Sequence, residues 1–409
     1  MNNPYRRLRL ACYTTNMSMS VVANLPPLLF LTFRSLYGIS YSLLGLLVLI
    51  NYVTQLGIDL LFSFFSHRFN IPKAVKNTPV IAVIGLLIYA VWPVLFKNAV
   101  YPGLVLGTVI FSAASGFAEV LISPVIAAIP AKDPDREMSK LHSIYAWGVV
   151  GVVIVSTVFL LIFGSDNWPW LAVLLALIPL SSAILFHGVT LPEMATPERA
   201  GNAFGLLRNK GIWLCFFAIF LGGAAECTMA QWASGYLEQA LGIQKIWGDV
   251  FGVALFAVML GTARSLYAKY GKNLNRILFF GAIAATVCYL IAAVTQVPVV
   301  GLAACALTGF CTGMFWPGSL VVASERYPAG GVFIFAFMAA GGDLGASFGP
   351  QLVGVITDFV IADPAAVSVA QELGISADQL GLKLGMLAGM LFPLIAIIVF
   401  KLNEKQNTK

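Results

Sequence analysis

Twelve apolar segments dominate the sequence and constrain its fold more than any other feature. A helix needs about 20 apolar residues to cross a bilayer. The runs that meet this length lie at roughly 8–33, 41–65, 77–96, 101–129, 141–164, 168–187, 211–238, 247–268, 275–295, 298–324, 330–361 and 380–402. Hydrophobic residues make up 59% of the 409 residues and charged residues only 10%, whereas a soluble domain carries about 25% charged residues. We therefore predict an all-α polytopic membrane protein in contact with the lipid bilayer.

The basic residues predict the orientation of these helices. Nineteen of the 24 Lys and Arg residues lie at the N-terminus, in the even-numbered loops and in the C-terminal tail. Four lie in the opposite loops, namely Arg34, Lys97, Lys245 and Lys383. Because cytoplasmic loops carry an excess of Lys and Arg, we expect both termini in the cytoplasm and a multi-pass protein of the cytoplasmic (inner) membrane. The basic N-terminus is not followed by a short apolar core with a small-residue cleavage site, so no cleaved signal peptide is predicted.

The chain divides near its middle into two halves of six predicted helices. The longest predicted cytoplasmic loop, 188–210, separates an N-terminal half at 1–187 from a C-terminal half at 211–409. The second and eighth spans carry a weak repeat, in which Leu56-Gly57-Ile58-Asp59 and Leu260-Gly261-Thr262-Ala263 stand 204 residues apart and each leads into a basic loop. Two pseudo-symmetric halves with a site between them at the membrane midplane are a plan found in transporters.

Several ionisable residues lie within the apolar segments. Glu119 stands near the middle of the fourth, where a charge costs about 2.5–3.5 kcal/mol on insertion scales. Glu226 and Asp343 lie in the seventh and eleventh segments. Arg264 lies in the eighth, and we expect Asp343 or Glu325 to pair with it. Such residues face a bundle interior or a water-filled cavity rather than lipid, so they are candidates for function.

The loop after the second span resembles a signature of the major facilitator superfamily. That family usually carries G-x-x-x-D-R-x-G-R/K there, and this chain reads Ser63-Phe-Phe-Ser-His67-Arg68-Phe-Asn-Ile-Pro-Lys73. The family's Gly and Asp are both replaced, by Ser63 and His67. The resemblance implies the major facilitator fold, in which the two halves rock around a central cavity in alternating access.

Three further motifs are similar to those of the fucose-permease-like sugar:proton symporters within this superfamily. The fourth span of that group reads E-x-x-x-N-P, and here it is Glu119-Val-Leu-Ile-Ser123-Pro124. The seventh reads E-x5-W-x3-Y, matched by Glu226, Trp232 and Tyr236. The tenth and eleventh carry G-x-x-x-P and a Gly-Gly run ending in P-x-x-x-G, matched by Gly313 to Pro317 and by Gly341-Gly342-Asp343 to Gly349-Pro350 and Gly354.

The resemblance implies a secondary transporter of a small polar organic solute, a monosaccharide being favoured, with proton coupling. It implies Glu119 as the proton-coupling acid, with Asp343 or Glu226 as a second titrating group. The resembled group also has an acid in its first span, where this chain offers Asn24, so Asn24 is assigned to solute. An aromatic ring beside a carboxylate suits a sugar, and Trp232 and Tyr236 share a helix face. The predicted solute contacts are Asn24, Glu226, Gln231, Trp232, Tyr236, Trp316 and Gln351. The predicted gating or structural residues are Asp59, Arg68, Arg264, Pro124, Pro317, Gly349 and Pro350.

Two other functions remain open from the sequence. The first is a proton-driven exporter of amphipathic compounds or drugs. Gly148 and Gly151 in the fifth span lack the proline typical of drug–proton antiporters, but Gly345, Gly349 and Pro350 form a similar run in the eleventh. The second is a membrane receptor or an intramembrane enzyme without flux. No phosphate-binding loop, hydrolase motif or metal-ligand cluster is present, so we expect no cofactor, no metal, no nucleic-acid partner and no enzymatic activity. The six cysteines lie in apolar runs and are interpreted as small packing residues. A monomer is expected, and no role is assigned to the loop 363–383 beyond a short outer helix.

Overall fold

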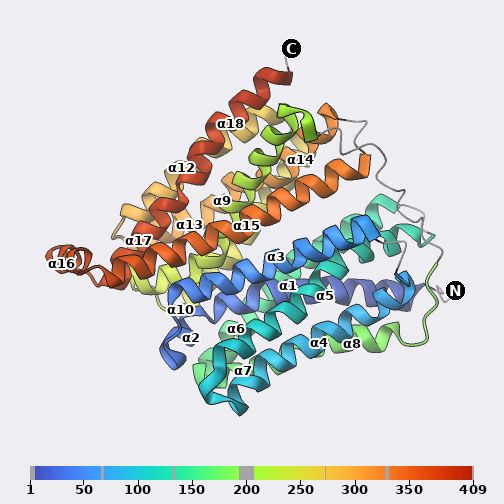
Figure 1. Ribbon diagram of the computed structural model, residues 1–409, viewed down its shortest axis with the longest axis horizontal. Helices are drawn as coiled ribbons and strands as arrows, with labels where there is room; N and C mark the ends of the chain where they lie inside the picture. Colours follow the sequence, from blue (N-terminus) through green and yellow to red (C-terminus); the bar gives the residue numbers. More distant parts are fainter. Residues whose placement is uncertain are drawn as a thin grey trace. The chain divides into compact units, whose positions relative to one another are not determined.

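The computed structural model describes residues 5–65, 69–130, 134–192, 207–271, 273–327 and 331–407. Nearly all of these residues are helical, and this part of the chain contains no β-strand (Figure 1). The helices of the first half are α1 (Arg6–Leu28), α2 (Phe30–Tyr37), α3 (Tyr41–Phe65), α4 (Ile71–Leu95), α5 (Val100–Ala128), α6 (Pro134–Phe163), α7 (Trp168–Leu175) and α8 (Leu177–Phe186).

The second half begins with α9 (Lys210–Leu241). It continues with α10 (Lys245–Trp247), the π-helix η5 (Gly248–Ala254), α11 (Leu255–Tyr270), α12 (Leu274–Val294), α13 (Pro298–Thr312), α14 (Phe315–Arg326), α15 (Gly331–Ala362), α16 (Pro364–Glu372), α17 (Ala377–Gly389) and α18 (Leu391–Asn407).

The helices reproduce the predicted membrane spans. Within the described ranges, ten helical segments are long and apolar enough to cross a membrane. The bent pair α1 and α2 forms an eleventh, with an angle of 46° between its parts. The shorter apolar helix Trp147–Phe163, the later part of α6, occupies the place of the fifth predicted span. The all-α, twelve-helix architecture expected from the sequence is therefore confirmed.

Proline residues account for two breaks within spans. Pro26 and Pro27 close α1, and the Leu29 N–H donates to the Pro26 carbonyl at 3.0 Å before α2 begins. Proline lacks a backbone N–H and its ring clashes with the preceding turn, so a helix bends or ends there. The second break separates α13 from α14 at Gly313 and Met314, directly before Trp316 and Pro317. This break leaves the Gly313 carbonyl free to accept a side-chain donor.

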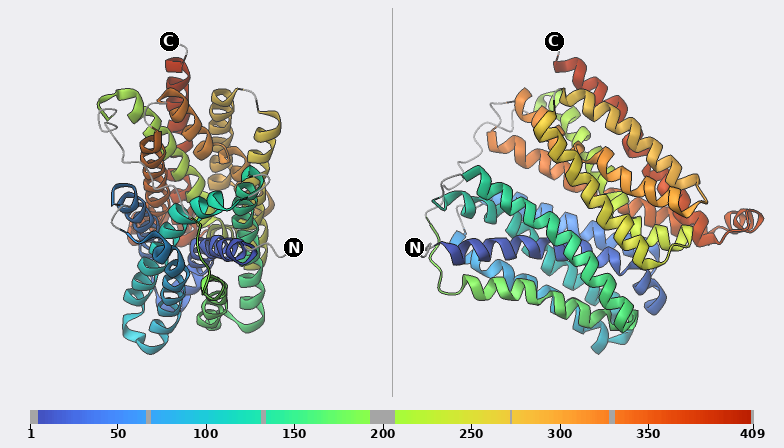
Figure 2. Two further views of the ribbon diagram at one scale, coloured as in Figure 1. Left: turned by 90° about the vertical axis from the view of Figure 1, so that its right-hand side faces the viewer. Right: turned by 180° about the vertical axis from the view of Figure 1, so that it is seen from behind.

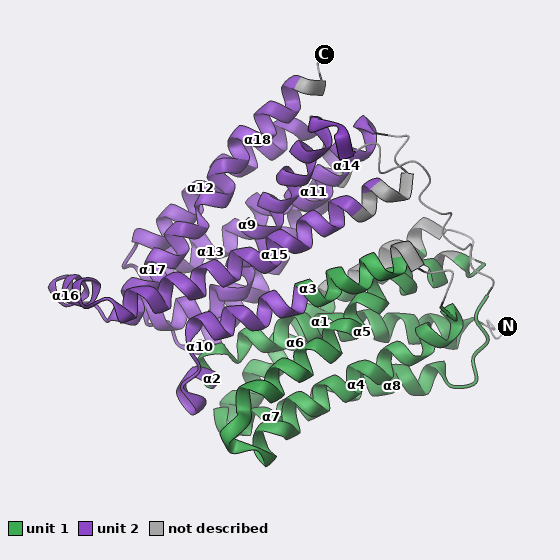
Figure 3. Ribbon diagram, viewed as in Figure 1, with its two compact units in different colours: residues 1–32, 53–199 green, residues 33–52, 200–409 purple. Residues whose placement is uncertain are grey.

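The chain forms two compact units, which are coloured separately in Figure 3. Unit 1 consists of residues 1–32 and 53–199, and unit 2 of residues 33–52 and 200–409. In unit 1, Phe62, Leu121 and Val125 belong to one buried apolar cluster. In unit 2, Phe315 is fully buried and its ring lies 5.2 Å from that of Phe400. The change of unit after residue 199 falls in the predicted linker 188–210, while the two six-helix halves themselves stay a prediction.

Glycine residues bring α15 and α9 into close contact in unit 2. A Cβ atom at Gly345 would lie 2.0 Å from the Phe220 carbonyl oxygen, and one at Gly349 would lie 2.2 Å from the Thr228 hydroxyl. Such distances are far below van der Waals contact, so only glycine fits at these positions. Small residues let membrane helices approach closely, and this run of α15 therefore serves as a packing surface for α9.

The predicted short helix in the loop 363–383 is also present. It is α16, whose first turn is capped by the Asp363 carboxylate accepting from the Ala365 N–H at 3.0 Å. In Figures 1 and 2 it projects away from the rest of unit 2. All six cysteines are free, and Cys12, Cys215 and Cys305 are buried, in agreement with a packing role.

The packing of α9 against α15 generates a stability prediction. We expect Gly345→Ala to lower the apparent melting temperature of the purified protein, because its added methyl group overpacks the helix contact at a cost of about 1–3 kcal/mol. The matched control is Gly151→Ala in α6, where a Cβ meets nothing within 4 Å. Thermal unfolding in detergent compares the two. If Gly345→Ala melted as high as Gly151→Ala, the close contact would be refuted.

Candidate functional site

In unit 1, the structure brings two carboxyl groups together at α3 and α5. The helices approach each other at Gly116, where a Cβ atom would lie 2.9 Å from the Ile58 Cβ. Asp59 follows Ile58, and Glu119 follows Gly116 by one helical turn. The two carboxyl groups lie within electrostatic range of each other. The sequence placed Asp59 among the gating residues, and its nearness to Glu119 was missed because the two residues lie on different helices.

The two acids differ in their surroundings. One carboxylate oxygen of Asp59 is buried and has no hydrogen-bond partner among the described residues. The Glu119 side chain is exposed although it stands within the 29-residue apolar helix α5, nine residues before its end. Because an ionisable group at membrane depth does not face lipid, the exposed surface of Glu119 is expected to face water or a solute inside the protein.

In unit 2, Arg264 of α11 pairs with Glu226 of α9. The Arg264 Nη2 atom lies 3.3 Å from each carboxylate oxygen of Glu226, and its Nε donates to the Gly313 carbonyl at 2.9 Å. The expectation that Asp343 or Glu325 would pair with Arg264 was wrong. The break between α13 and α14 explains the difference, because its free carbonyl fixes the guanidinium beside α9. The Arg264 side chain is 42% exposed and that of Glu226 16%, so the guanidinium remains accessible beside its carboxylate.

Further polar groups surround this ion pair. The Cys227 thiol donates to the Tyr52 hydroxyl at 3.6 Å. It also lies within electrostatic range of Glu226, Arg264 and Asp343. Asp343 is 6% exposed and is thus kept from lipid. We call Tyr52, Glu226, Cys227, Arg264, Trp316 and Asp343 the midspan cluster.

Trp316 joins the midspan cluster through the glycines of α9 and α15. A Cβ atom at Gly342 would lie 2.5 Å from the Trp316 ring, and one at Gly223 would lie 2.3 Å from the Gly342 carbonyl oxygen. Glu226 follows Gly223 by one turn, and Asp343 follows Gly342 directly. The Trp316 side chain is half-buried and keeps part of its ring accessible. Of the predicted solute residues, Trp316 therefore lies beside Gly223, one helical turn from Glu226.

Two aromatic residues predicted to contact solute are instead buried in the packing of unit 2. Trp232 is 0% exposed, its indole Nε1 donates to the Pro350 carbonyl at 2.9 Å, and its ring lies 5.9 Å from that of Tyr41. Tyr236 is also 0% exposed and its hydroxyl donates to the Ala292 carbonyl. In this conformation neither ring offers a surface to a solute, so the stacking assigned to Trp232 requires another conformation.

The remaining predicted solute residues occupy different surroundings. Gln231 is 6% exposed. The side-chain oxygen of Gln351 is buried without a hydrogen-bond partner among the described residues. Asn24 is half-buried in unit 1, and its Nδ2 donates to the Ser20 carbonyl at 2.9 Å. None of these three belongs to the midspan cluster.

The predicted gating residues fall into several groups. Pro124 lies inside α5 and is exposed, and Pro317 lies in the first turn of α14. Gly349 packs on α9, and Pro350 accepts the hydrogen bond of Trp232. Arg68 lies outside the described residues.

Comparisons with known proteins agree with this architecture. A bacterial homologue of the human lysosomal transporter Spinster, in an inward-facing and occupied conformation, superposes with a TM-score of 0.70 at 15% identity, over 99% of this chain and 98% of the other. The nucleoside transporter NupG, in a mutant form, superposes with a TM-score of 0.75 at 12% sequence identity, and the match covers 98% of this chain and all of the other. The E. coli fucose:proton symporter superposes with a TM-score of 0.62 at 14% sequence identity, and the match covers 98% of this chain and 99% of the symporter. At such identities these likenesses show the fold alone.

Comparisons at the level of sequence identify the family. No curated protein sequence matches the chain significantly. The sequence profile described as Major Facilitator Superfamily matches residues 11–350, which is most of the chain. The chain, an all-α protein with twelve membrane helices, therefore belongs to the major facilitator superfamily.

Proposed function

We propose that this protein is a secondary active transporter that moves a small polar organic solute across the cytoplasmic membrane, coupled to protons. We propose a monosaccharide as the solute, alternating access between the two predicted halves as the mechanism, a monomer as the working unit and cytoplasmic termini. Structures of the same fold include proteins named as a fucose:proton symporter and a D-xylose-proton symporter, which supports this choice of solute and coupling ion.

The observation that carries the proposal is the pair of carboxyl groups at Asp59 and Glu119. Two carboxylates near each other repel, which disfavours charging both at once. A pair of this kind holds one proton readily and releases it when water or a cation reaches it. Glu119 is exposed and can exchange that proton, while Asp59 has a buried oxygen without a hydrogen-bond partner among the described residues.

The midspan cluster is the proposed solute site in the second half. Glu226 and the guanidinium of Arg264 offer an acceptor and a donor side by side, which is what a sugar hydroxyl needs, because it both donates and accepts. The half-buried indole of Trp316 supplies an apolar surface beside them. Since Arg264 already balances the charge of Glu226, we assign Glu226 to solute rather than to the proton, and Asp343 becomes the second proton candidate.

A ligand screen tests the solute class. A solute that binds only the folded protein raises its stability by RT ln(1 + [L]/Kd). We expect purified protein to melt at a higher temperature with one class of monosaccharide, and the shift to be larger at acid than at neutral pH. Sugar acids, amino acids and hydrophobic cations complete the panel. Stabilisation by several unrelated hydrophobic cations, with none by any sugar, would replace the symporter by the exporter.

Substitution of the carboxyl pair tests the coupling. We expect Glu119→Gln and Asp59→Asn each to abolish accumulation of solute driven by a pH gradient, because neither variant can share a proton between two carboxyls. Exchange of labelled for unlabelled solute at equal pH should persist in both. The control is Glu372→Gln on the exposed surface of α16, which should accumulate solute normally. Undiminished pH-driven accumulation by Glu119→Gln would remove the proton assignment.

A further inference from the structure

Residues 33–52 belong to the first half by sequence and to unit 2 by their contacts (Figure 3). They form the later part of α2, a short turn and the first half of α3. The rest of α3 continues into unit 1 without a break. This segment thus ties one sequence half to helices of the other, and we call it the bridging segment.

The first contact of the bridging segment is at the N-terminus of α3. The backbone N–H groups of Tyr41 and Ser42 donate to the two carboxylate oxygens of Asp358 in α15, at 3.0 and 2.6 Å. The first N–H groups of a helix lack partners within the helix, and a negative charge is favoured there by the helix dipole. Asp358 therefore caps a helix that lies more than 300 residues away in sequence.

A local cap is present as well. The Ser40 hydroxyl accepts from the Leu43 N–H at 3.3 Å. Because this local cap does not involve α15, α3 keeps part of its N-terminal capping when Asp358 is withdrawn. The remote cap can therefore be released without unwinding the helix.

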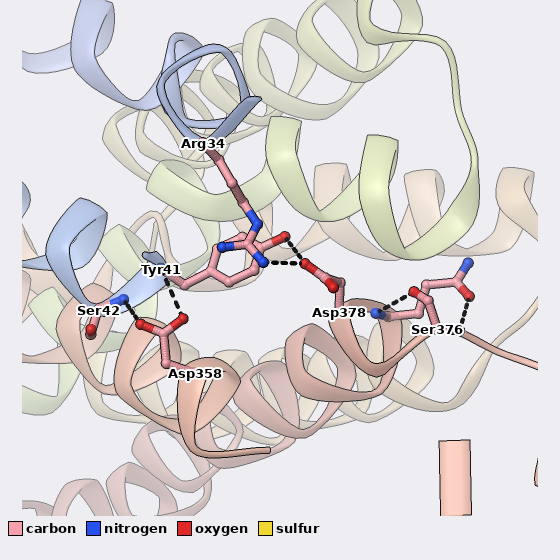
Figure 4. A network of polar contacts seen from close by, with 7 residues as sticks. Arg34, Tyr41, Ser42, Asp358, Ser376 and Asp378 are labelled. Atoms are coloured by element: carbon pink, nitrogen blue, oxygen red, sulfur yellow. Dashed lines mark hydrogen bonds and ion pairs between the residues drawn. The ribbon is translucent and has the colours of Figure 1, made fainter. Parts of the chain in front are cut away.

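The second contact joins Arg34, Tyr41 and Asp378 (Figure 4). The Arg34 Nη2 atom lies 2.6 Å from one oxygen of Asp378, and the Tyr41 hydroxyl donates to the same oxygen at 3.1 Å. The Arg34 guanidinium carbon lies 4.0 Å from the centroid of the Tyr41 ring, in cation–π contact. Asp378 stands in the first turn of α17, whose start is fixed by a capping box between Ser376 and Gln379.

The exposure of these charges makes the contact reversible. The Arg34 and Asp378 side chains are 28% and 25% exposed, so water reaches both in the closed pair. A fully buried pair is expensive to separate, and a fully exposed pair contributes little. The partly exposed pair of Arg34 and Asp378 can therefore stabilise the closed conformation and still separate when the segment moves.

Glycine residues bring the backbones close together beneath these contacts, and the buried Tyr41 ring packs beside that of Trp232. A Cβ atom at Gly354 of α15 would lie 2.3 Å from the Tyr41 carbonyl oxygen. A Cβ atom at Gly45 of α3 would lie 2.9 Å from the Gln351 side-chain oxygen. Opening this contact would separate the polar partners and would also part the Tyr41 ring from Trp232.

We propose that Arg34, Tyr41, Asp358 and Asp378 form a latch that closes the predicted outer side of the transporter. The latch holds the bridging segment against α15 and α17 in the conformation described here, and it opens when the solute site turns outward. The distribution of basic residues predicts that Arg34 and Asp378 lie on the side opposite the termini. The proposal rests on alternating access and adds the residues that control one of its two states.

The test uses Cys227 of the midspan cluster as a natural reporter. Its thiol contacts the Tyr52 hydroxyl, at the end of the bridging segment. A membrane-impermeant maleimide is applied to intact cells, and the rate of Cys227 modification is followed by mass spectrometry, with Cys227→Ser to identify the signal. Loss of hydrogen bonds to a charged group shifts a two-state equilibrium by about tenfold or more. We therefore expect Asp358→Ala and Arg34→Asp each to accelerate labelling about tenfold.

Two further variants give the controls. The charge swap of Arg34→Asp with Asp378→Arg restores an ion pair, and it should return the labelling rate to within about twofold of the parent, because opposite charges again attract. Asp363→Asn alters a carboxylate of the same loop that caps only α16, and it should leave the rate unchanged.

Unchanged labelling in folded Asp358→Ala and Arg34→Asp would overturn the latch, as would a charge swap that labels as fast as either single reversal. If Asp358→Ala fails to reach the membrane, Asp378→Asn carries the same expectation, because it keeps the side-chain shape and removes only the charge. The labelling needs no solute and no proton gradient. The labelling result can therefore contradict the latch even if the protein transports solute. It can likewise support the latch even if no proton-coupled transport is found.

Discussion

The cost of placing charge at membrane depth is the constraint on which the functional interpretation depends. Hydrocarbon offers no water to a carboxylate or a guanidinium, so each must find a partner, a proton or an aqueous path. The structure shows one of these solutions, and we propose a second. Arg264 and Glu226 neutralise each other, with the guanidinium also held by the Gly313 carbonyl. Asp59 and Glu119 lie within electrostatic range of each other, and the proposed solution there is a shared proton.

Close helix packing positions these groups. The glycines of α15 allow the backbone of α9 to approach until a single methyl group would not fit. That approach places the Trp316 ring against Gly342 and Gly223, next to Asp343 in sequence and one helical turn from Glu226. The same helix, α15, carries Asp358, which caps α3. One glycine-rich helix thus contacts both the proposed solute site and the proposed latch, which gives a physical route by which changes at one could reach the other.

The sequence predicted the helices well and the contacts between them only in part. Membrane spans follow from composition over about 20 residues, so all twelve positions were found. Side-chain partners depend on which helices are neighbours, and spacing along one helix does not contain that information. For this reason Arg264 was assigned to the wrong acid, and Asp59 was not connected with Glu119.

The aromatic motif of α9 shows a second limit. Its match to a sugar-transporter pattern indicated a surface for stacking, whereas the structure buries Trp232 against Tyr41 and Pro350. Tyr41 comes from the bridging segment, whose capping residue Asp358 lies more than 300 residues away in sequence. A local motif cannot reveal such a contact, and in this conformation the tryptophan supports the closed segment rather than a solute.

The most direct test of the central claim is the movement of protons caused by solute. Protein is reconstituted in liposomes with equal pH on both sides, the solute found by the stability screen is added outside, and the external pH is recorded with a weak buffer. Proton coupling predicts a rise of the external pH as protons enter with the solute, and no such rise when the protein carries Glu119→Gln. Entry of solute into the liposomes without any change of external pH would contradict proton coupling.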